Sequence, residues 1–256
     1  MNVKQKQRGF TLVEMSIVVV IIGLILGAVS IGKDLQRDAE YAKVKQKFVD
    51  QWVQAYNTFY ERSGVVIGDD QTAPQLMVNG ETYNTGTTVS GGNMALVTGP
   101  TAICQGSSAP GIPAPVATNL GLHAYMDGLG IRMPPGRAEG QEDRYVYLDS
   151  NGNPQEIQVC FQWNNPTTVS GSGNVMVITG LTPDLARKLD QMVDGKADAR
   201  EGMFRQLQVD GSGFGGAGLE WEGNNTIVFT ADRDSTGDNK DEDQVLTLVA
   251  HYKMNQ

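Results

Sequence analysis

Glu14 is the acidic residue with the most unusual surroundings in this sequence. It is the only charged residue in the segment 10–31, which is dominated by Ile, Val and Leu. A helix of about 20 apolar residues, rising roughly 1.5 Å per residue, crosses a hydrocarbon layer about 30 Å thick. A carboxylate in such a helix costs free energy unless a partner compensates it, so it is treated as a functional residue by default. The sequence therefore predicts a membrane-spanning helix whose one carboxylate has a dedicated partner.

The residues around the apolar run set its orientation and argue against two simpler interpretations. Lys4, Lys6 and Arg8 precede it, which predicts a cytoplasmic N-terminus. A secretory signal would have a shorter apolar core followed by a small-residue cleavage site, and residues 27–30 match such a site poorly. A plain membrane anchor explains the length and the charges but leaves Glu14 without a role.

The segment Arg8-Gly9-Phe10-Thr11-Leu12-Val13-Glu14 resembles the cleavage and methylation site of type IV prepilins and type II secretion pseudopilins. The resemblance implies that a prepilin peptidase cuts between Gly9 and Phe10 and methylates the new N-terminal amine of Phe10. Gly9 has no Cβ, which suits a backbone that must lie close to a catalytic site. Glu14 then becomes the fifth residue, where the family keeps a glutamate.

Cleavage would also supply the partner that Glu14 needs. The resemblance implies that Glu14 pairs with the charged amine of Phe10 on a neighbouring subunit, which neutralises the carboxylate and sets the axial register of a filament. The open alternative is that Glu14 pairs with its own N-terminus or lies at the membrane interface.

A cluster of acidic side chains occupies one loop near the C-terminus. Calcium takes about six to eight oxygen ligands from such loops, and like charges packed together without an ion repel each other. The loop lacks the bidentate Glu of an EF-hand, but some type II pseudopilins, which this chain resembles, bind calcium in a C-terminal loop. A solvated acidic loop and a calcium site are both open interpretations here; the residues are Asp232, Asp234, Asp238, Asp241 and Asp243.

Two weaker motif matches have simpler structural explanations. Asp149, Asn151 and Asn153 have the spacing of a calcium loop, but Cys160 takes the place of the final Glu, and an Asn-Gly hairpin turn fits better. The glycines within residues 211–216 match a dinucleotide fingerprint, yet the segment after them resembles a strand, which favours a turn.

The chain has two cysteines, Cys104 and Cys160. The predicted orientation places both outside the cytoplasm, where disulfides persist, and a bridge between them would contribute roughly 4 kcal/mol. Two free buried thiols are the alternative. With no Cys-x-x-Cys pair and two histidines, the sequence argues against a zinc site of the usual Cys/His type.

Composition narrows the function classes further. The net charge is −9, and the sequence contains no run of Lys and Arg, so we expect no direct nucleic-acid binding. The sequence contains no GxSxG motif, P-loop or zinc motif, so an enzymatic or ligand-binding head is only a remote alternative. We expect no cofactor other than calcium.

One long helix is predicted over residues 10–64. Its second half carries apolar residues at three- and four-residue spacing, which predicts a stripe packed on a globular head: Tyr41, Val44, Phe48, Trp52, Ala55 and Phe59. Gly64 is the expected C-cap. The expected organisation is a leader at 1–9, the helix at 10–64 with its membrane span over about 10–31, and a head at 65–256.

The head is expected to contain a mostly antiparallel sheet. Alternating apolar residues predict five strands: 144–148, 156–161, 174–179, 225–230 and 245–250. The first two strands are expected to form one hairpin, and the last two another. Thr182 and Pro183 predict the start of a helix that Gly195 ends. Residues 65–120 are expected to hold loops and short strands. The predicted fold class is α+β, a pilin-like layout with a long N-terminal helix packed on the sheet.

The resemblance implies a structural subunit rather than an enzyme. It would be held in the inner membrane as a single-pass precursor and then polymerise through its helix with copies of itself and other pilins, helped by the inner-membrane assembly machinery. The expected product is an extracellular type IV pilus. The alternative is a periplasmic type II secretion pseudopilus, or a minor or tip subunit, which the large head favours.

Overall fold

The computed structural model describes residues 11–83, 94–105, 121–207, 221 and 247–254. The chain divides into two compact units, Met1–Glu40 and Tyr41–Gln256.

The described part of the first unit is helical from Leu12 onward. Helix α1 spans Leu12–Val44, and every residue from Leu12 to Ile31 is exposed. The apolar side chains of this part of the helix project from all of its sides, so it has no polar face to turn toward water. Such a helix needs lipid or other apolar helices around it.

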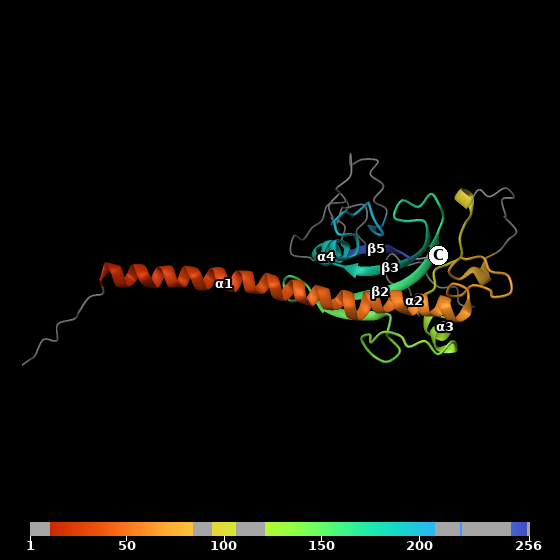
Figure 1. The fold of residues 1–256 in the computed structure, drawn as a ribbon, viewed down its shortest axis with the longest axis horizontal. Coiled ribbons are helices and arrows are strands. Elements are labelled where there is room, and N and C mark those ends of the chain that lie inside the picture. The colour runs from red at the N-terminus through yellow and green to blue at the C-terminus, as the bar shows by residue number, and fades with distance from the viewer. Residues whose placement is uncertain (1–10, 84–93, 106–120, 208–220, 222–246, 255–256) are drawn as a thin grey trace, which may run out of the picture. The chain divides into compact units, whose positions relative to one another are not determined.

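A π-helical turn, Lys45–Val49, joins α1 to α2, which spans Asp50–Ser63 (Figure 1). The Lys45 ammonium nitrogen lies 2.7 and 2.9 Å from the two carboxylate oxygens of Asp50, an ion pair across five residues that matches the hydrogen-bond spacing of a π turn. The helix ends where predicted: Gly64 has a φ of 76° and its N–H donates to the Tyr60 carbonyl at 2.8 Å.

The sheet in the second unit has five strands in the order β1-β2-β3-β5-β4, and every neighbouring pair is antiparallel. The strands are β1 Arg144–Leu148, β2 Pro154–Asn164, β3 Gly173–Leu181, β4 Phe204–Gln206 and β5 Leu248–Lys253. The α+β fold class is confirmed, as are the β1–β2 hairpin and the third predicted strand. In the hairpin turn, the Asp149 carboxylate accepts the N–H groups of Asn151 and Asn153, both at 2.8 Å, so this carboxylate serves the turn.

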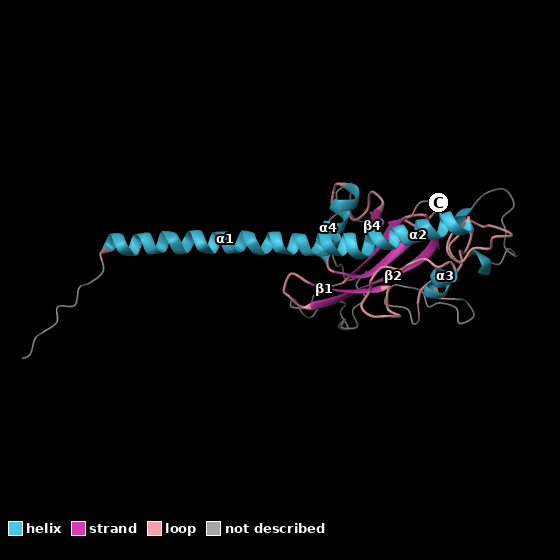
Figure 2. Ribbon diagram, turned by 60° about the horizontal axis from the view of Figure 1, so that its bottom comes forward, coloured by secondary structure: helices cyan, strands magenta, loops and turns pink. Residues whose placement is uncertain are grey.

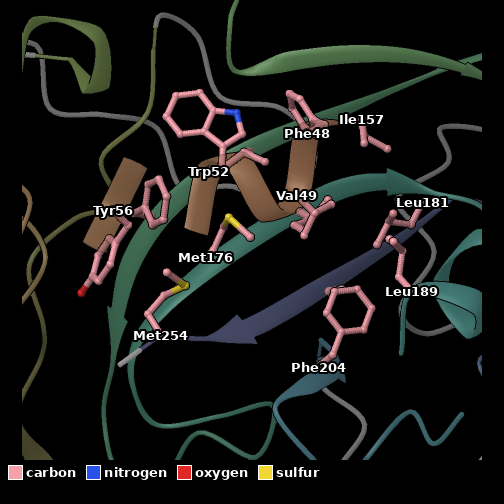
Figure 3. Packing of buried hydrophobic residues seen from close by; sticks show 14 of the residues in the cluster. Phe48, Val49, Trp52, Tyr56, Ile157, Met176, Leu181, Leu189, Phe204 and Met254 are labelled. Atoms are coloured by element: carbon pink, nitrogen blue, oxygen red, sulfur yellow. The ribbon is translucent and has the colours of Figure 1, made fainter. Parts of the chain in front are cut away.

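The predicted apolar stripe of the helix lies against one face of the sheet (Figures 2 and 3). All six of its residues are buried, and Val49 and Tyr56 join them. The rings of Trp52 and Tyr56 lie 6.1 and 5.3 Å from that of Phe161 in β2. Since burying one large apolar side chain stabilises a fold by about 1.5–3 kcal/mol, this contact is a major source of the head's stability.

The opposite face of the sheet carries a smaller cluster. Cys160, Val175 and Val177 alternate with the residues that face α2, and they pack with Ala102 and Cys104. Ile103 pairs with Phe161 as an isolated bridge, so residues 102–104 run alongside β2. The disulfide therefore lies on the sheet face that α2 does not cover.

Helix α4, Pro183–Asp194, begins and ends as predicted. The Thr182 hydroxyl accepts the Leu185 N–H at 3.4 Å, and Gly195 is the C-cap. Before the helix, Gly180 has a φ of 78° at a break in the β3–β5 register, where a Cβ would clash with the Glu156 carbonyl. The Tyr147 hydroxyl donates to the Gly180 carbonyl and accepts the Thr182 N–H, which fixes this bulge.

Several elements were not predicted from the sequence. Helix α3, Leu122–Gly128, and strand β4 fall in segments without a clear pattern. Residues 65–83 and 94–105 contain the 3₁₀ turns Gly80–Thr82 and Met94–Leu96, and within these two ranges the expected short strands are reduced to the bridge at Ile103.

The predicted C-terminal hairpin is described only in part. Strand β5 begins at Leu248, within the predicted segment 245–250, but residues 225–230 lie outside the described part of the chain. Over Ala250 to Tyr252, β5 pairs with β3 on one side and β4 on the other. Both edges of this part of β5 are therefore occupied by strands other than the predicted partner.

Candidate functional site

Thr11 and Glu14 form a reciprocal cap at the start of α1. The Glu14 Oε2 atom accepts the Thr11 backbone N–H at 2.8 Å and the Thr11 hydroxyl at 2.9 Å, and the Glu14 N–H donates to Thr11 Oγ1 at 3.3 Å. This is the capping-box geometry, in which two unsatisfied N–H groups of the first turn gain partners. Sequence reasoning overlooked this cap, although the Thr-x-x-Glu spacing is its usual signal.

The cap gives Glu14 a role within its own chain. Its hydrogen bonds use Oε2, and the residue is exposed, so the carboxylate stays accessible beside the helix start. The predicted cleavage and methylation residues, Gly9 and Phe10, lie outside the described residues. Thr11 directly follows Phe10, so the cap holds the carboxylate within one residue of the position where a new amine would arise.

The apolar half of α1 is exposed along its whole length from Leu12 to Ile31. Leu12, Val19 and Leu24 are 86%, 68% and 69% exposed. By length and composition α1 belongs to the one helix in the described residues that could cross a membrane. A Cβ added at Gly23 or Gly27 would meet no described atom within 4 Å, so close packing within this chain does not explain these glycines.

The two cysteines form the predicted disulfide. Cys104 and Cys160 are joined, and both residues are buried. The bond ties the segment 102–104 to β2 beside the Ile103–Phe161 bridge. This confirms the pairing but gives the cysteines a structural role, because a buried disulfide offers no free thiolate.

Each of the two histidines lies beside a group with which it could form a chemical site. Ser170 Oγ lies 3.0 Å from His251 Nδ1, but both side chains are buried, and burial lowers the pKa of His251 to about 4, so the ring is neutral. His123 Nδ1 lies 3.3 Å from a carboxylate oxygen of Glu142. Within the described residues, no group of three or more His, Cys, Asp or Glu side chains is arranged to hold a metal ion.

A buried aspartate in α4 was not predicted. Asp190 is fully buried, and its Oδ2 accepts the Trp221 indole N–H at 2.8 Å and the Asp198 backbone N–H. Burial, together with the neighbouring Asp194 carboxylate, raises the pKa of Asp190 to about 7. The residue therefore holds a proton well above the usual pKa of an aspartate, and it anchors Trp221 in the core.

The predicted calcium loop is not described by the structure. Asp232, Asp234, Asp238, Asp241 and Asp243 all fall within residues 222–246, which lie outside the described part of the chain. The calcium site remains a prediction.

Comparison with known proteins identifies the N-terminal segment. Residues 4–30 match the family model described as the prokaryotic N-terminal methylation motif. A search of the curated proteins and a search of the solved structures found no match. The matched residues contain Gly9, Phe10, the Thr11–Glu14 cap and most of the exposed apolar run. The chain therefore carries the signal segment of type IV pilins and pseudopilins, joined to a long N-terminal helix and an antiparallel sheet in a pilin-like layout.

Proposed function

We propose that this protein is a structural subunit of a type IV pilus or a pilus-like filament. The precursor is cut between Gly9 and Phe10, the amine of Phe10 is methylated, and the mature chain polymerises through α1. The observation that carries the proposal is the exposed, all-round apolar surface of α1 next to a matched methylation motif. An apolar helix of this length is stable in a bilayer or in a bundle of like helices, and cleavage allows the move from one to the other.

Glu14 has two successive roles in this proposal. In the single chain its carboxylate caps α1 through Thr11. In the filament the same carboxylate pairs with the Phe10 amine of a neighbouring copy, which compensates its charge in an apolar core. Pairing at one defined position along the helix also sets the axial offset between subunits.

The precursor is held in the inner membrane by α1, with residues 1–9 on the cytoplasmic side and the head outside the cytoplasm. The disulfide supports this location, because such bonds persist in oxidising compartments. The partners are the prepilin peptidase, the assembly machinery, and copies of this chain or other pilins. A secretion pseudopilus is the second candidate product, since pseudopilins carry the same signal segment.

Substitution of Glu14 tests its assembly role. Glu14→Gln keeps a carbonyl oxygen for the Thr11 cap but removes the charge, whereas Glu14→Ala removes both. Both variants are expected to be cut between Gly9 and Phe10 and to yield far fewer polymers in sheared fractions. Normal polymer yield from Glu14→Gln would show that the charge has no part in assembly. Loss of yield in Glu14→Ala alone would assign Glu14 to helix capping.

A further inference from the structure

A cavity of about 540 Å³ lies in the second unit, between α2 and the segment 131–135. One wall consists of Ala55 and polar side chains from residues 46–62, and the other is the segment 131–135. Ligand-binding pockets commonly have volumes of about 300–1,000 Å³, so this hollow is large enough to hold a short peptide segment or a comparable group. We call it the cationic groove.

The side chains that line the groove share one electrostatic character. No carboxylate is among the twelve lining residues, although the chain contains 29 acidic and 20 basic residues. Three cations and three amides line it: Lys47, Arg62 and Arg132, and Gln46, Gln51 and Gln54. These groups donate hydrogen bonds to anionic oxygens, and the guanidinium of an Arg can bind both oxygens of a carboxylate.

The groove is held open by contacts within the head. Arg62 donates from Nη1 to the carbonyls of Leu129 and Gly130, at 2.8 and 3.0 Å, which fixes the start of the second wall against α2. Ile131 is buried and anchors the same wall in the core. The shape is therefore present before any ligand arrives, which lowers the entropic cost of binding.

The charges in the groove are available to a partner. Lys47 and Arg132 are exposed, and within the described part of the chain neither forms an ion pair. Cations near one another repel, so an anion entering the groove relieves that repulsion as well as gaining hydrogen bonds.

We propose that the cationic groove binds a carboxylate-bearing segment of a second copy of this chain. Copies meet at high local concentration if the chain polymerises, so the proposal rests in part on the filament function. The charges are complementary, because the chain has a net charge of −9 and its described surface carries exposed carboxylates that form no ion pair among the described residues. Examples are Glu61, Asp127, Glu139 and Glu201. Met133 and Pro135 supply apolar contacts for the aliphatic part of such a segment.

Site-specific photo-crosslinking in the full-length, membrane-assembled protein tests the proposal. A photoreactive amino acid replaces Gln54, which is exposed and lines the groove. Illumination is expected to give a covalent dimer of this chain, and peptide mapping is expected to place the link in an acidic segment. Arg132→Glu, which turns attraction into repulsion, is expected to lower the dimer yield about tenfold or more. Arg132→Lys is expected to retain most of the yield.

A matched control separates the groove from general charge effects. Lys253→Glu makes the same charge change at an exposed residue of β5 that does not line the groove, and it is expected to leave the dimer yield unchanged. Absence of the dimer, or a link to a different protein or to a polysaccharide, would overturn the proposal. The same samples report cleavage between Gly9 and Phe10, so a cut chain without dimers rejects the groove alone. An uncut chain that still forms the dimer rejects the filament function and supports the groove.

Discussion

At the scale of single residues, Asp190 links the stability of the head to pH. Its side chain is buried between α4, the turn at Asp198 and Trp221, and its neighbour Asp194 also carries a carboxylate. The Trp221 indole N–H donates to the buried side chain, and Lys196, which pairs with Asp198, interacts with it electrostatically. Burial and the Asp194 charge favour the protonated acid, so the folded protein binds a proton that the unfolded chain releases at lower pH.

The direction of the pH effect follows from this difference. The pKa of Asp190 is about 7 in the folded protein and near 3.8 when exposed, so between these values the folded state binds more protons. Stability contributed by this residue is therefore greatest in acid and declines as the pH rises from about 4 to about 7. Asp190→Asn imitates the protonated form, because its amide oxygen can still accept from Trp221 and Asp198 while its NH₂ group faces Asp194.

Asp190→Asn is expected to flatten the pH dependence of the unfolding midpoint between about pH 4 and pH 7, and to raise the midpoint at about pH 8. Denaturant unfolding of the full chain in detergent, repeated across this range, measures both effects. Asp127→Asn, which removes the charge of an exposed residue in α3, serves as the control. Parallel pH profiles for Asp190→Asn and the unsubstituted protein would show that Asp190 is ionised throughout.

At the scale of elements, the sheet is supported on both faces by different means. The helix packs aromatic rings on one face, and the disulfide fastens the segment 102–104 to the other. The two cysteines are separated by 56 positions in the sequence, so their bond restricts a long loop in the unfolded chain.

Removing the disulfide is expected to lower the free energy of unfolding by about 4 kcal/mol in the chain-entropy description. Cys104→Ala together with Cys160→Ala, compared with the unsubstituted protein with and without reductant, measures the effect. Reductant should destabilise the unsubstituted head and leave the double variant unchanged. Equal stability of oxidised and reduced protein would argue that the bond contributes nothing.

The end of α2 depends on the backbone conformation of Gly64. Its φ of 76° is unfavourable for a residue with a Cβ, so Gly64→Ala is expected to destabilise the head by about 1 kcal/mol or more. Gly128→Ala is a matched control, because Gly128 lies in α3 without a positive φ and a Cβ there meets no described atom within 4 Å. The midpoint of thermal unfolding is expected to be lower for Gly64→Ala than for Gly128→Ala. Equal midpoints would contradict the assignment of Gly64 as the C-cap.

At the scale of the whole molecule, the sequence predicted those elements whose pattern of residues lies within one short segment. The spacing of Phe48, Trp52 and Phe59 predicted the buried helix face, and Thr182 with Gly195 predicted both ends of α4. By contrast, β4 has three residues and forms by pairing with β5, which lies far along the chain. So short a strand carries too few residues for an alternating pattern to show.

The candidate sites also differ in whether their residues are close together in the sequence. Glu14 was identifiable because a carboxylate in an apolar run is conspicuous, and its cap with Thr11 is a local spacing. The burial of Asp190 depends on Trp221, and the cationic groove brings Arg132 beside α2, so both need contacts between distant segments. A single sequence does not reveal which distant segments meet.

If the chain is a processed filament subunit, its mature form has a defined first residue and a defined mass. Intact-mass analysis and N-terminal sequencing, applied to membrane and sheared surface fractions from cells with an active prepilin peptidase, would show where the chain begins. We predict a chain that begins at N-methylated Phe10, lacking residues 1–9. Its presence in the sheared fraction indicates a pilus, and its confinement to membranes indicates a pseudopilus or a minor subunit. A chain that still begins at Met1 would exclude processing after Gly9 and leave an ordinary membrane anchor.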